Sequence, residues 1–265
     1  MSGFSDYARS MMTYIRTELD PHRLVLFISN TASGPQGEKD PFDLADLVML
    51  NRYKKWAEDS LIVTQRWPQK AVFLAEFGTA QLAADGKLGP TFLSEWDKLT
   101  PGNPHVIGAA LWTFNDYRSG WPGTKPSGFR TWGVVDELRR PKPAYQQIRT
   151  LFCPARTVQV TGRSITVQVR GKDEIPSYPM RGYRIVWGRL EANSGFSLVG
   201  GVDLPTLKPG DPAWCGELPR TLDLSTGSWA VRLMSPTGFD VAEVRIGTKI
   251  PDTHSSADAT APDGQ

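Results

Sequence analysis

The sequence contains little cysteine and histidine, with 2 Cys and 3 His among 265 residues. Cys153 and Cys215 do not belong to a Cys-x-x-Cys motif, and the histidines lie far apart in the chain. Because a zinc site needs clustered thiolate or imidazole ligands, these spacings exclude the usual zinc-binding patterns. We interpret the two cysteines as unpaired structural thiols, with a disulfide between them as the alternative.

Long hydrophobic runs and a strong charge bias are also absent. No stretch approaches the ~18 apolar residues of a membrane-spanning helix, and the formal net charge is only +2. Since Lys and Arg are scattered, we expect neither nucleic acid nor a membrane as a partner. The first residues, MSGFSDYARSMM, lack the basic and apolar regions of a signal peptide. The sequence therefore predicts no particular cellular location.

The first 152 residues instead show an alternation of apolar runs and amphipathic segments. The apolar runs predict buried strands at residues 23–29, 46–51, 70–78 and 105–114. Helical periodicity and punctuation predict helices at residues 7–19, 52–65, 90–99 and 142–152. Strands that alternate with helices are typical of a parallel sheet with crossover helices. Four such units after a leading helix predict half of an eight-stranded (β/α)8 barrel, a TIM barrel, at residues 1–152.

The pattern changes to short strands after residue 155. The segment TVQVTGRSITVQVR alternates with period two around Thr161-Gly162, which predicts a β-hairpin. The segments GYRIVWGRL, TLDL, SWAVRLMS and DVAEVRI predict further strands. We expect an immunoglobulin-like β-sandwich at residues 156–247 and a disordered tail at residues 248–265. Trp187, Trp214 and Trp229 are interpreted as packing residues of this domain, with a carbohydrate-binding face as the alternative.

Polar and aromatic side chains gather where the predicted strands of the first domain end. In a parallel barrel these carboxyl ends form the active-site face, so we expect one mouth to contain Asn30, Arg52, Tyr53, Glu76, Trp112, Asn115 and Asp116. A buried carboxylate without partners is costly, so Tyr53 or Arg52 should hydrogen-bond to Glu76. The alternative is a structural role for Glu76, as a cap of the next segment.

A carboxylate beside aromatic rings suits a sugar, since an indole stacks on the apolar face of a pyranose while hydroxyls take directed hydrogen bonds. Cleavage of a glycosidic bond requires two carboxylic groups. Six of the nine tryptophans lie within the first 152 residues, which is compatible with a sugar site and equally with core packing.

Several of these motifs together resemble a known family. FLAEFG and ALWTFNDYRSGWPGTKPSGFRTWGVVDELRRPKPAY are similar to the end of the catalytic barrel of glycoside hydrolase family 2. This family includes β-galactosidases, β-glucuronidases and β-mannosidases. ELDPHRLVLFISN and DLVMLNRYKKW match its fifth and sixth barrel strands in order and spacing. The resemblance covers about Tyr7 to Phe152, so it implies that residues 1–152 hold strands 5–8, the C-terminal half of the barrel.

The resemblance implies a retaining β-glycosidase and assigns roles to the predicted site residues. Glu76 corresponds to the nucleophile, Tyr53 to the tyrosine that neighbours it, and Trp112 to the indole beneath the sugar. Asn115 and Asp116 would contact substrate or shape their loop, and Arg52 and Asn30 are further residues of the mouth. The expected partner is a carbohydrate substrate, and no cofactor or metal is expected.

The sequence departs from the family in one important respect. The acid/base glutamate of the family lies in an Asn-Glu motif, and this sequence contains no Asn-Glu dipeptide. We therefore expect a fragment that is inactive alone and that pairs with the missing N-terminal half or with itself. The glucuronidase motif Asn-x-Lys is absent between residues 115 and 133, which favours a neutral sugar such as galactose. The alternative function is a non-catalytic carbohydrate-binding or interaction protein derived from such a barrel.

Overall fold

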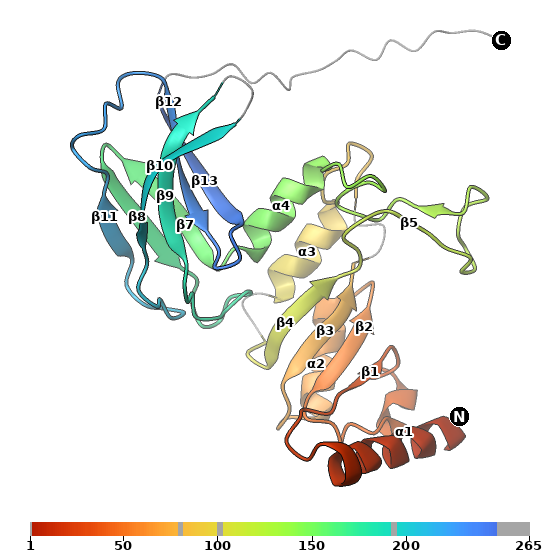
Figure 1. Cartoon of the computed structure of the whole chain (residues 1–265). Helices are drawn as coiled ribbons and strands as arrows, with labels where there is room; N and C mark the ends of the chain where they lie inside the picture. Colours follow the sequence, from red (N-terminus) through yellow and green to blue (C-terminus); the bar gives the residue numbers. More distant parts are fainter. Residues whose placement is uncertain (1, 79–81, 100–102, 192–194, 248–265) are drawn as a thin grey trace, which may run out of the picture. The chain divides into compact units, whose positions relative to one another are not determined.

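The computed structural model describes residues 2–78, 82–99, 103–191 and 195–247, and Figure 1 shows its helices and strands. The chain divides into two compact units. The first comprises Met1–Pro154, Val169–Pro179 and Lys208–Asp211, and the second comprises most of the remainder from Ala155 onward. The segments at 169–179 and 208–211 lie within the range that the sequence analysis assigned to the β domain. The predicted disordered tail, residues 248–265, lies outside the described residues.

The first unit is a mixed α/β structure around one parallel sheet (Figure 1). Its four strands are adjacent in chain order and all parallel: β1 (Phe27–Ser29), β2 (Val48–Arg52), β3 (Val72–Phe77) and β4 (Val106–Leu111). Its helices are α1 (Ser2–Tyr14), which continues as a π-helical turn at Ile15–Leu19, a 3-10 helix at Pro35–Lys39, α2 (Trp56–Arg66), α3 (Pro90–Leu99) and α4 (Pro143–Phe152). A short hairpin pairs β5 (Tyr117–Arg118) with β6 (Phe129–Arg130). The predicted alternation of parallel strands and helices is confirmed.

Several predicted boundaries in this unit are wrong. The helix expected at residues 52–65 begins at Trp56, and the strand expected at residues 105–114 ends at Leu111. The first helix begins at Ser2, five residues before the expected start, and Ser5 in this added part donates a hydrogen bond to the Lys39 carbonyl oxygen. The first strand covers only Phe27–Ser29 of the predicted run 23–29. Apolar periodicity was sufficient to locate these elements but could not show where their backbone hydrogen bonds begin and end.

The core of the first unit lies on one face of the sheet. Side chains of alternating strand residues, such as Val48, Leu50, Val72 and Leu74, are completely buried on that face. α2 and α3 contribute aromatic rings to the same core, where the rings of Trp56 and Trp96 have their centroids 6.4 Å apart. These two tryptophans therefore serve packing.

The opposite face of the sheet is more open. Ile28 of β1 and Ile107 of β4 are 52% and 60% exposed, whereas their neighbours Phe27 and Val106 are half-buried and buried. Large apolar side chains on a sheet face are normally covered in parallel α/β proteins. The candidate site begins on this open face, near the carboxyl end of β3.

The second unit is antiparallel. One sheet has the order β10-β9-β12-β13 and the other β11-β8-β7. The strands are β7 (Ala155–Thr161), β8 (Ser164–Val169), β9 (Arg184–Leu190), β10 (Phe196–Asp203), β11 (Trp214–Glu217), β12 (Ser228–Met234) and β13 (Asp240–Gly247). The β7–β8 hairpin around Thr161-Gly162 is confirmed. The predicted strand TLDL is wrong, because Asp223 accepts hydrogen bonds from Ser225 and Thr226 and the segment turns there.

Neither cysteine forms a disulfide within the described part of the chain, where Cys153 is buried and Cys215 is exposed. This agrees with their interpretation as thiols. Among the described helices, none combines the length and the apolar character needed to cross a membrane.

Candidate active site

Glu76 reaches the open face of the sheet through a β-bulge in β3. Leu50 of β2 is paired with Leu74, but the next residue, Asn51, is paired with Glu76, so Ala75 is an extra residue. Regular alternation would direct Glu76 to the same face as Leu74. The extra residue instead returns Phe77 to the core, where it is completely buried, and leaves the half-buried Glu76 facing away from it. A carboxylate can therefore follow an apolar strand without entering the core.

The partner of Glu76 is Tyr53, one of the two residues, Tyr53 and Arg52, that the sequence analysis expected to bond to it. The Tyr53 hydroxyl, just beyond the end of β2, donates a hydrogen bond to Glu76 Oε2. Burial, followed by the hydrogen bond and the charge of Glu76, raises the pKa of Tyr53 well above its usual value of 10. Tyr53 thus stays protonated across the physiological range and remains a donor to the carboxylate.

Asn51 is a neighbour of this pair that the sequence analysis did not include among the site residues. It is opposite Glu76 in the strand register, so both side chains start on the same face. Its side-chain oxygen is buried, and no hydrogen-bond donor reaches it among the described residues. A buried acceptor without a donor is uncommon and would suit a substrate hydroxyl. Its position at the end of a buried strand was the available sequence signal.

Tyr53 also lines a pocket of about 990 Å³, here called the aromatic pocket. Four of the predicted site residues line it, namely Asn30, Arg52, Tyr53 and Trp112. The other lining residues are Asn51, Lys54, Lys55, Glu58, Asp59, Tyr117, Ser119, Trp121, Pro122, Gly123, Arg130 and Trp132. The aromatic pocket therefore lies at the carboxyl ends of β1, β2 and β4, and Glu76, Asn115 and Asp116 of the predicted mouth are not among its lining residues.

The aromatic side chains of the pocket are held against one another. Trp112 Nε1 donates a hydrogen bond of 3.0 Å to the Tyr117 hydroxyl, and their rings meet edge to face with centroids 5.7 Å apart. Tyr117 in turn contacts Trp132, with the two ring centroids 6.4 Å apart. Such edge-to-face contacts fix ring orientation. The pocket thus presents a supported aromatic wall near the Tyr53 hydroxyl.

Most charges in the aromatic pocket are paired within the protein. Arg52 Nε lies 2.7 Å from Asp59 Oδ2, and Lys55 Nζ lies 3.3 Å from Glu58 Oε2. Arg52 therefore braces the site and does not contact Glu76 in any described hydrogen bond. Each of the two pocket-lining carboxylates thus lies beside a cation of the same chain.

Arg130 is a second residue that the sequence analysis did not single out. Its guanidinium lies over the Trp132 ring, 4.7 Å from the centroid, and its Nε donates to Thr124 Oγ1 at 2.9 Å. Its Nη2 also donates to the Pro122 carbonyl oxygen at 3.4 Å, so its described partners are neutral groups. It therefore brings a fixed positive charge to the pocket. Because Arg130 makes its contacts within the short β5–β6 hairpin, the hydrophobic periodicity of the sequence gave no signal for this residue.

Asn115 and Asp116 are used within the protein. Asp116 Oδ1 accepts hydrogen bonds from Gly133 N at 2.9 Å and from Lys142 Nζ at 2.6 Å, and Asp116 is only 5% exposed. Asn115 Nδ2 donates to the Asp116 carbonyl oxygen at 2.8 Å. Neither residue lines the aromatic pocket. The sequence analysis expected Asn115 and Asp116 either to contact substrate or to shape their loop. These contacts favour the second role, in the loop that carries Trp132.

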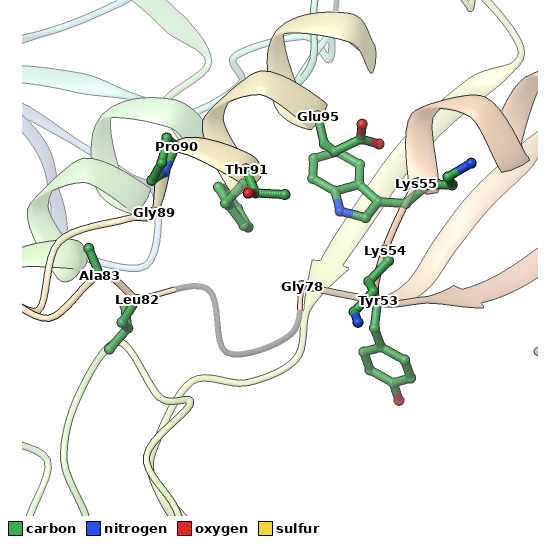
Figure 2. Close-up of a pocket in the computed structure, with 12 residues that line it drawn as sticks. Tyr53, Lys54, Lys55, Gly78, Leu82, Ala83, Gly89, Pro90, Thr91 and Glu95 are labelled. Atoms are coloured by element: carbon green, nitrogen blue, oxygen red, sulfur yellow. The ribbon is translucent and has the colours of Figure 1, made fainter.

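A second pocket of about 540 Å³ shares Tyr53, Lys54 and Lys55 with the aromatic pocket. Figure 2 shows its lining, in which Tyr53 and Lys54 lie opposite the first turn of α3. The Tyr53 hydroxyl points away from Thr91 and Glu95 in this view. Glu95 is itself buried and accepts from the Ala57 backbone at 3.2 Å. This pocket therefore flanks the site without contributing a further carboxylate to Glu76. No group of three or more His, Cys, Asp or Glu side chains suited to a metal is found among the described residues.

The Tyr53 hydrogen bond gives a direct prediction. Tyr53→Phe removes the donor to Glu76 but keeps the ring, and a hydrogen bond to a charged group contributes about 1.5–3 kcal/mol. With Glu76 as the nucleophile that the sequence resemblance implies, we expect its reaction with an activated glycoside to be about 10- to 100-fold slower, as measured by mass spectrometry of the glycosylated chain. Tyr14→Phe, at an exposed tyrosine of α1, should react like the unchanged chain. Equal rates for all three proteins would contradict a positioning role for Tyr53.

Comparison with known proteins finds no match to a protein-family profile and none to a curated protein. Solved structures do match. A β-glucuronidase of Bacteroides uniformis is 15% identical, with a TM-score of 0.45 over 93% of this chain. A glycosyl hydrolase family 2 member of Bacteroides cellulosilyticus is 13% identical, with a TM-score of 0.42 over 94% of this chain. A β-glucuronidase of Faecalibacterium prausnitzii is 22% identical, with a TM-score of 0.41 over 52% of this chain.

The chain spans 31%, 33% and 26% of those three proteins, respectively. Members of the family that the sequence resembles are thus among the solved structures to which this chain is similar. The match in each case is to a part of a longer protein.

Proposed function

We propose that this chain is the nucleophile-bearing portion of a retaining β-glycosidase, organised as the C-terminal half of a (β/α)8 barrel with an immunoglobulin-like β-sandwich. One observation carries the proposal: Tyr53 lines the aromatic pocket and donates a hydrogen bond to Glu76. An oriented carboxylate beside a pocket with three tryptophans provides one of the two carboxylic groups and the aromatic surface that sugar cleavage by covalent catalysis needs.

In the proposed reaction the sugar stacks on Trp112, and a Glu76 oxygen attacks its anomeric carbon. The bond from that carbon to the leaving oxygen breaks, and a glycosyl ester of Glu76 forms. The Tyr53 hydroxyl holds the carboxylate in position before the attack. Asn51 Oδ1, which has no donor among the described residues, accepts a hydrogen bond from a sugar hydroxyl. Water then hydrolyses the ester.

A second carboxylic group must donate a proton to the leaving oxygen and later activate water, at about 5 Å from Glu76. The carboxylates that line the aromatic pocket, Glu58 and Asp59, are each in an ion pair. We propose that a partner that covers the open sheet face, where Ile28 and Ile107 are exposed, supplies this group. The isolated chain would then bind sugar and accept a glycosyl group from a reactive donor, but would not turn over ordinary glycosides.

The alternative is a carbohydrate-binding protein without catalysis. The ion pairs of Glu58 and Asp59 with Lys55 and Arg52 favour it, since both carboxylates that line the pocket already have partners within the chain. The two functions differ in one observable. A binding protein forms no covalent product, whereas the proposed glycosidase does.

Dinitrophenyl 2-deoxy-2-fluoro-β-glycosides test this difference. Dinitrophenolate leaves without a proton from a general acid, so the absence of the second carboxylate does not prevent formation of the glycosyl ester. The fluorine slows hydrolysis of the ester, which then accumulates. We expect the unchanged chain to release up to one equivalent of dinitrophenolate and to gain the mass of one glycosyl group. Sugar binding without either change would support the alternative function.

The sugar class is open to a separate test. The absence of Asn-x-Lys favours a neutral sugar such as galactose, whereas the pocket cation Arg130 favours an acidic one. If Arg130 binds an acidic sugar, Arg130→Gln should lower the rate at which an acidic glycosyl donor labels the chain by about 10-fold or more. The rate of labelling by a neutral glycosyl donor should stay the same. With a neutral substrate, the unchanged chain reacts faster with the galactosyl donor. Arg118→Gln is the control, because Arg118 is exposed on the same hairpin and does not line the pocket.

A further inference from the structure

The N-terminal helix α1 presents two faces of different character. Its inner face is held to the first unit by buried Ala8 and Met12. Ion pairs support the same side, since Arg9 lies 2.7 Å from Asp43 and Arg16 lies 2.7 Å from Asp46. The helix is therefore fixed in rotation about its axis, and the side chains of its outer face are presented in a defined order.

The outer face carries an exposed row of large apolar side chains, here called the α1 seam. The row consists of Phe4, Tyr7, Met11 and Tyr14, which are 66%, 62%, 37% and 48% exposed. Phe4, at the start of the row, also contacts Phe27 of β1, with the two ring centroids 6.2 Å apart. Their spacing of three and four residues is the a/d repeat of paired helices. Single exposed apolar residues are ordinary, but a continuous row of this kind marks an interaction surface.

The residues that flank the α1 seam restrict what can pair with it. The flanking positions of the repeat hold Gly3, Ser10 and Thr17 on one side, none of which is charged. A second copy can therefore approach without repulsion between like charges. An acidic or basic partner helix would gain nothing from these neutral flanks.

The charge of Glu18 determines whether two copies of α1 would pack parallel or antiparallel. Glu18 continues the repeat after Tyr14 and is exposed, so two parallel copies would bring two Glu18 side chains together. In an antiparallel pair each Glu18 instead lies beside the first turn of the other helix. That turn contains no acidic residue, and its free backbone N–H groups favour a negative charge.

We propose that the α1 seam is a homodimer interface in which two copies of α1 pack antiparallel about a two-fold axis, with Tyr7 of each copy against Met11 of the other. Each exposed seam side chain offers about 100 Å², so the pair buries on the order of 800 Å². Because stable interfaces bury about 1,200–2,000 Å², we expect a weak dimer with a dissociation constant in the micromolar range.

Sedimentation of the full chain over concentrations from about 1 to 500 µM tests the proposal. The unchanged chain should pass from monomer to dimer, and Tyr7→Glu and Met11→Lys should each remain monomeric. An equimolar mixture of the two variants should recover the dimer, because the antiparallel pair sets the introduced carboxylate of one chain against the introduced ammonium group of the other. Leu61→Gln, at an exposed apolar residue of α2, should dimerise like the unchanged chain, and circular dichroism checks that each variant folds.

Three results would overturn the proposal. The first is a monomer at every concentration, which would leave the seam to a different partner. The second is a dimer that the seam variants leave intact. The third is a mixture of the two variants that stays monomeric although the unchanged chain dimerises, since a parallel pair sets position 7 of one chain against position 7 of the other.

Discussion

Replacement of Glu76 by Gln should abolish formation of the glycosyl ester on this chain. The substitution keeps the size of the side chain but removes the anionic oxygen that attacks the sugar. We expect the rate of labelling by a dinitrophenyl 2-deoxy-2-fluoro-β-glycoside to fall by on the order of 10⁴ or more, since loss of a nucleophile removes the covalent pathway. Dinitrophenolate release followed by absorbance gives the rate.

The matched control for this variant is Glu58→Gln. Glu58 also lines the aromatic pocket, but its carboxylate is paired with Lys55 and is 62% exposed. We expect this variant to be labelled at close to the unchanged rate. If both variants lost labelling equally, the result would indicate a general loss of pocket structure. If both kept it, Glu76 would not be the nucleophile.

Loss of Asp116 should produce the largest change in stability among the site substitutions. Asp116→Ala removes the partner of Lys142, whose side chain is only 19% exposed, and also the acceptor of the Gly133 backbone N–H. Breaking a buried ion pair from one side costs about 3–5 kcal/mol. We expect the free energy of unfolding of the first unit to fall by about 3 kcal/mol, as measured by urea denaturation.

An exposed ion pair provides the comparison for this effect. Arg9 and Asp43 are also 2.7 Å apart, but their side chains are 38% and 59% exposed. Asp43→Ala should cost less than about 1 kcal/mol, as surface pairs usually do. Adding Lys142→Met to Asp116→Ala should recover part of the lost stability, since it removes the unpaired cation. A cost below about 1 kcal/mol for Asp116→Ala would contradict the role of this carboxylate as the clamp of the loop.

Much of the first unit could be predicted because its signals are local. Apolar runs and helical periodicity located the four parallel strands and their helices. The expected contact between Tyr53 and Glu76 followed from the rule that parallel strands end at one edge of a sheet. The prediction also rested on electrostatics, since a half-buried carboxylate needs a hydrogen-bond donor. The hydrogen bond between these two side chains confirms the contact.

The features that were missed depend on contacts between distant segments. The bulge at Ala75 exists only in the register with β2, so no window within β3 could show it. Arg130 lines the pocket from a short hairpin that has no hydrophobic periodicity. Asp116 bonds to Lys142, which lies 26 residues away in the sequence. TLDL resembles a strand in composition, but side-chain hydrogen bonds to Asp223 turn the backbone there. Local propensity cannot anticipate such competition.

The most direct test of the central claim is to identify the labelled residue. The chain is treated with the dinitrophenyl 2-deoxy-2-fluoro-β-glycoside that reacts faster, digested, and mapped by tandem mass spectrometry. The proposal predicts one glycosyl group, attached to Glu76 within the peptide that contains AVFLAEFG. A label on any other residue, or a chain that binds the sugar and remains unlabelled, would contradict the claim that Glu76 is a glycosidase nucleophile.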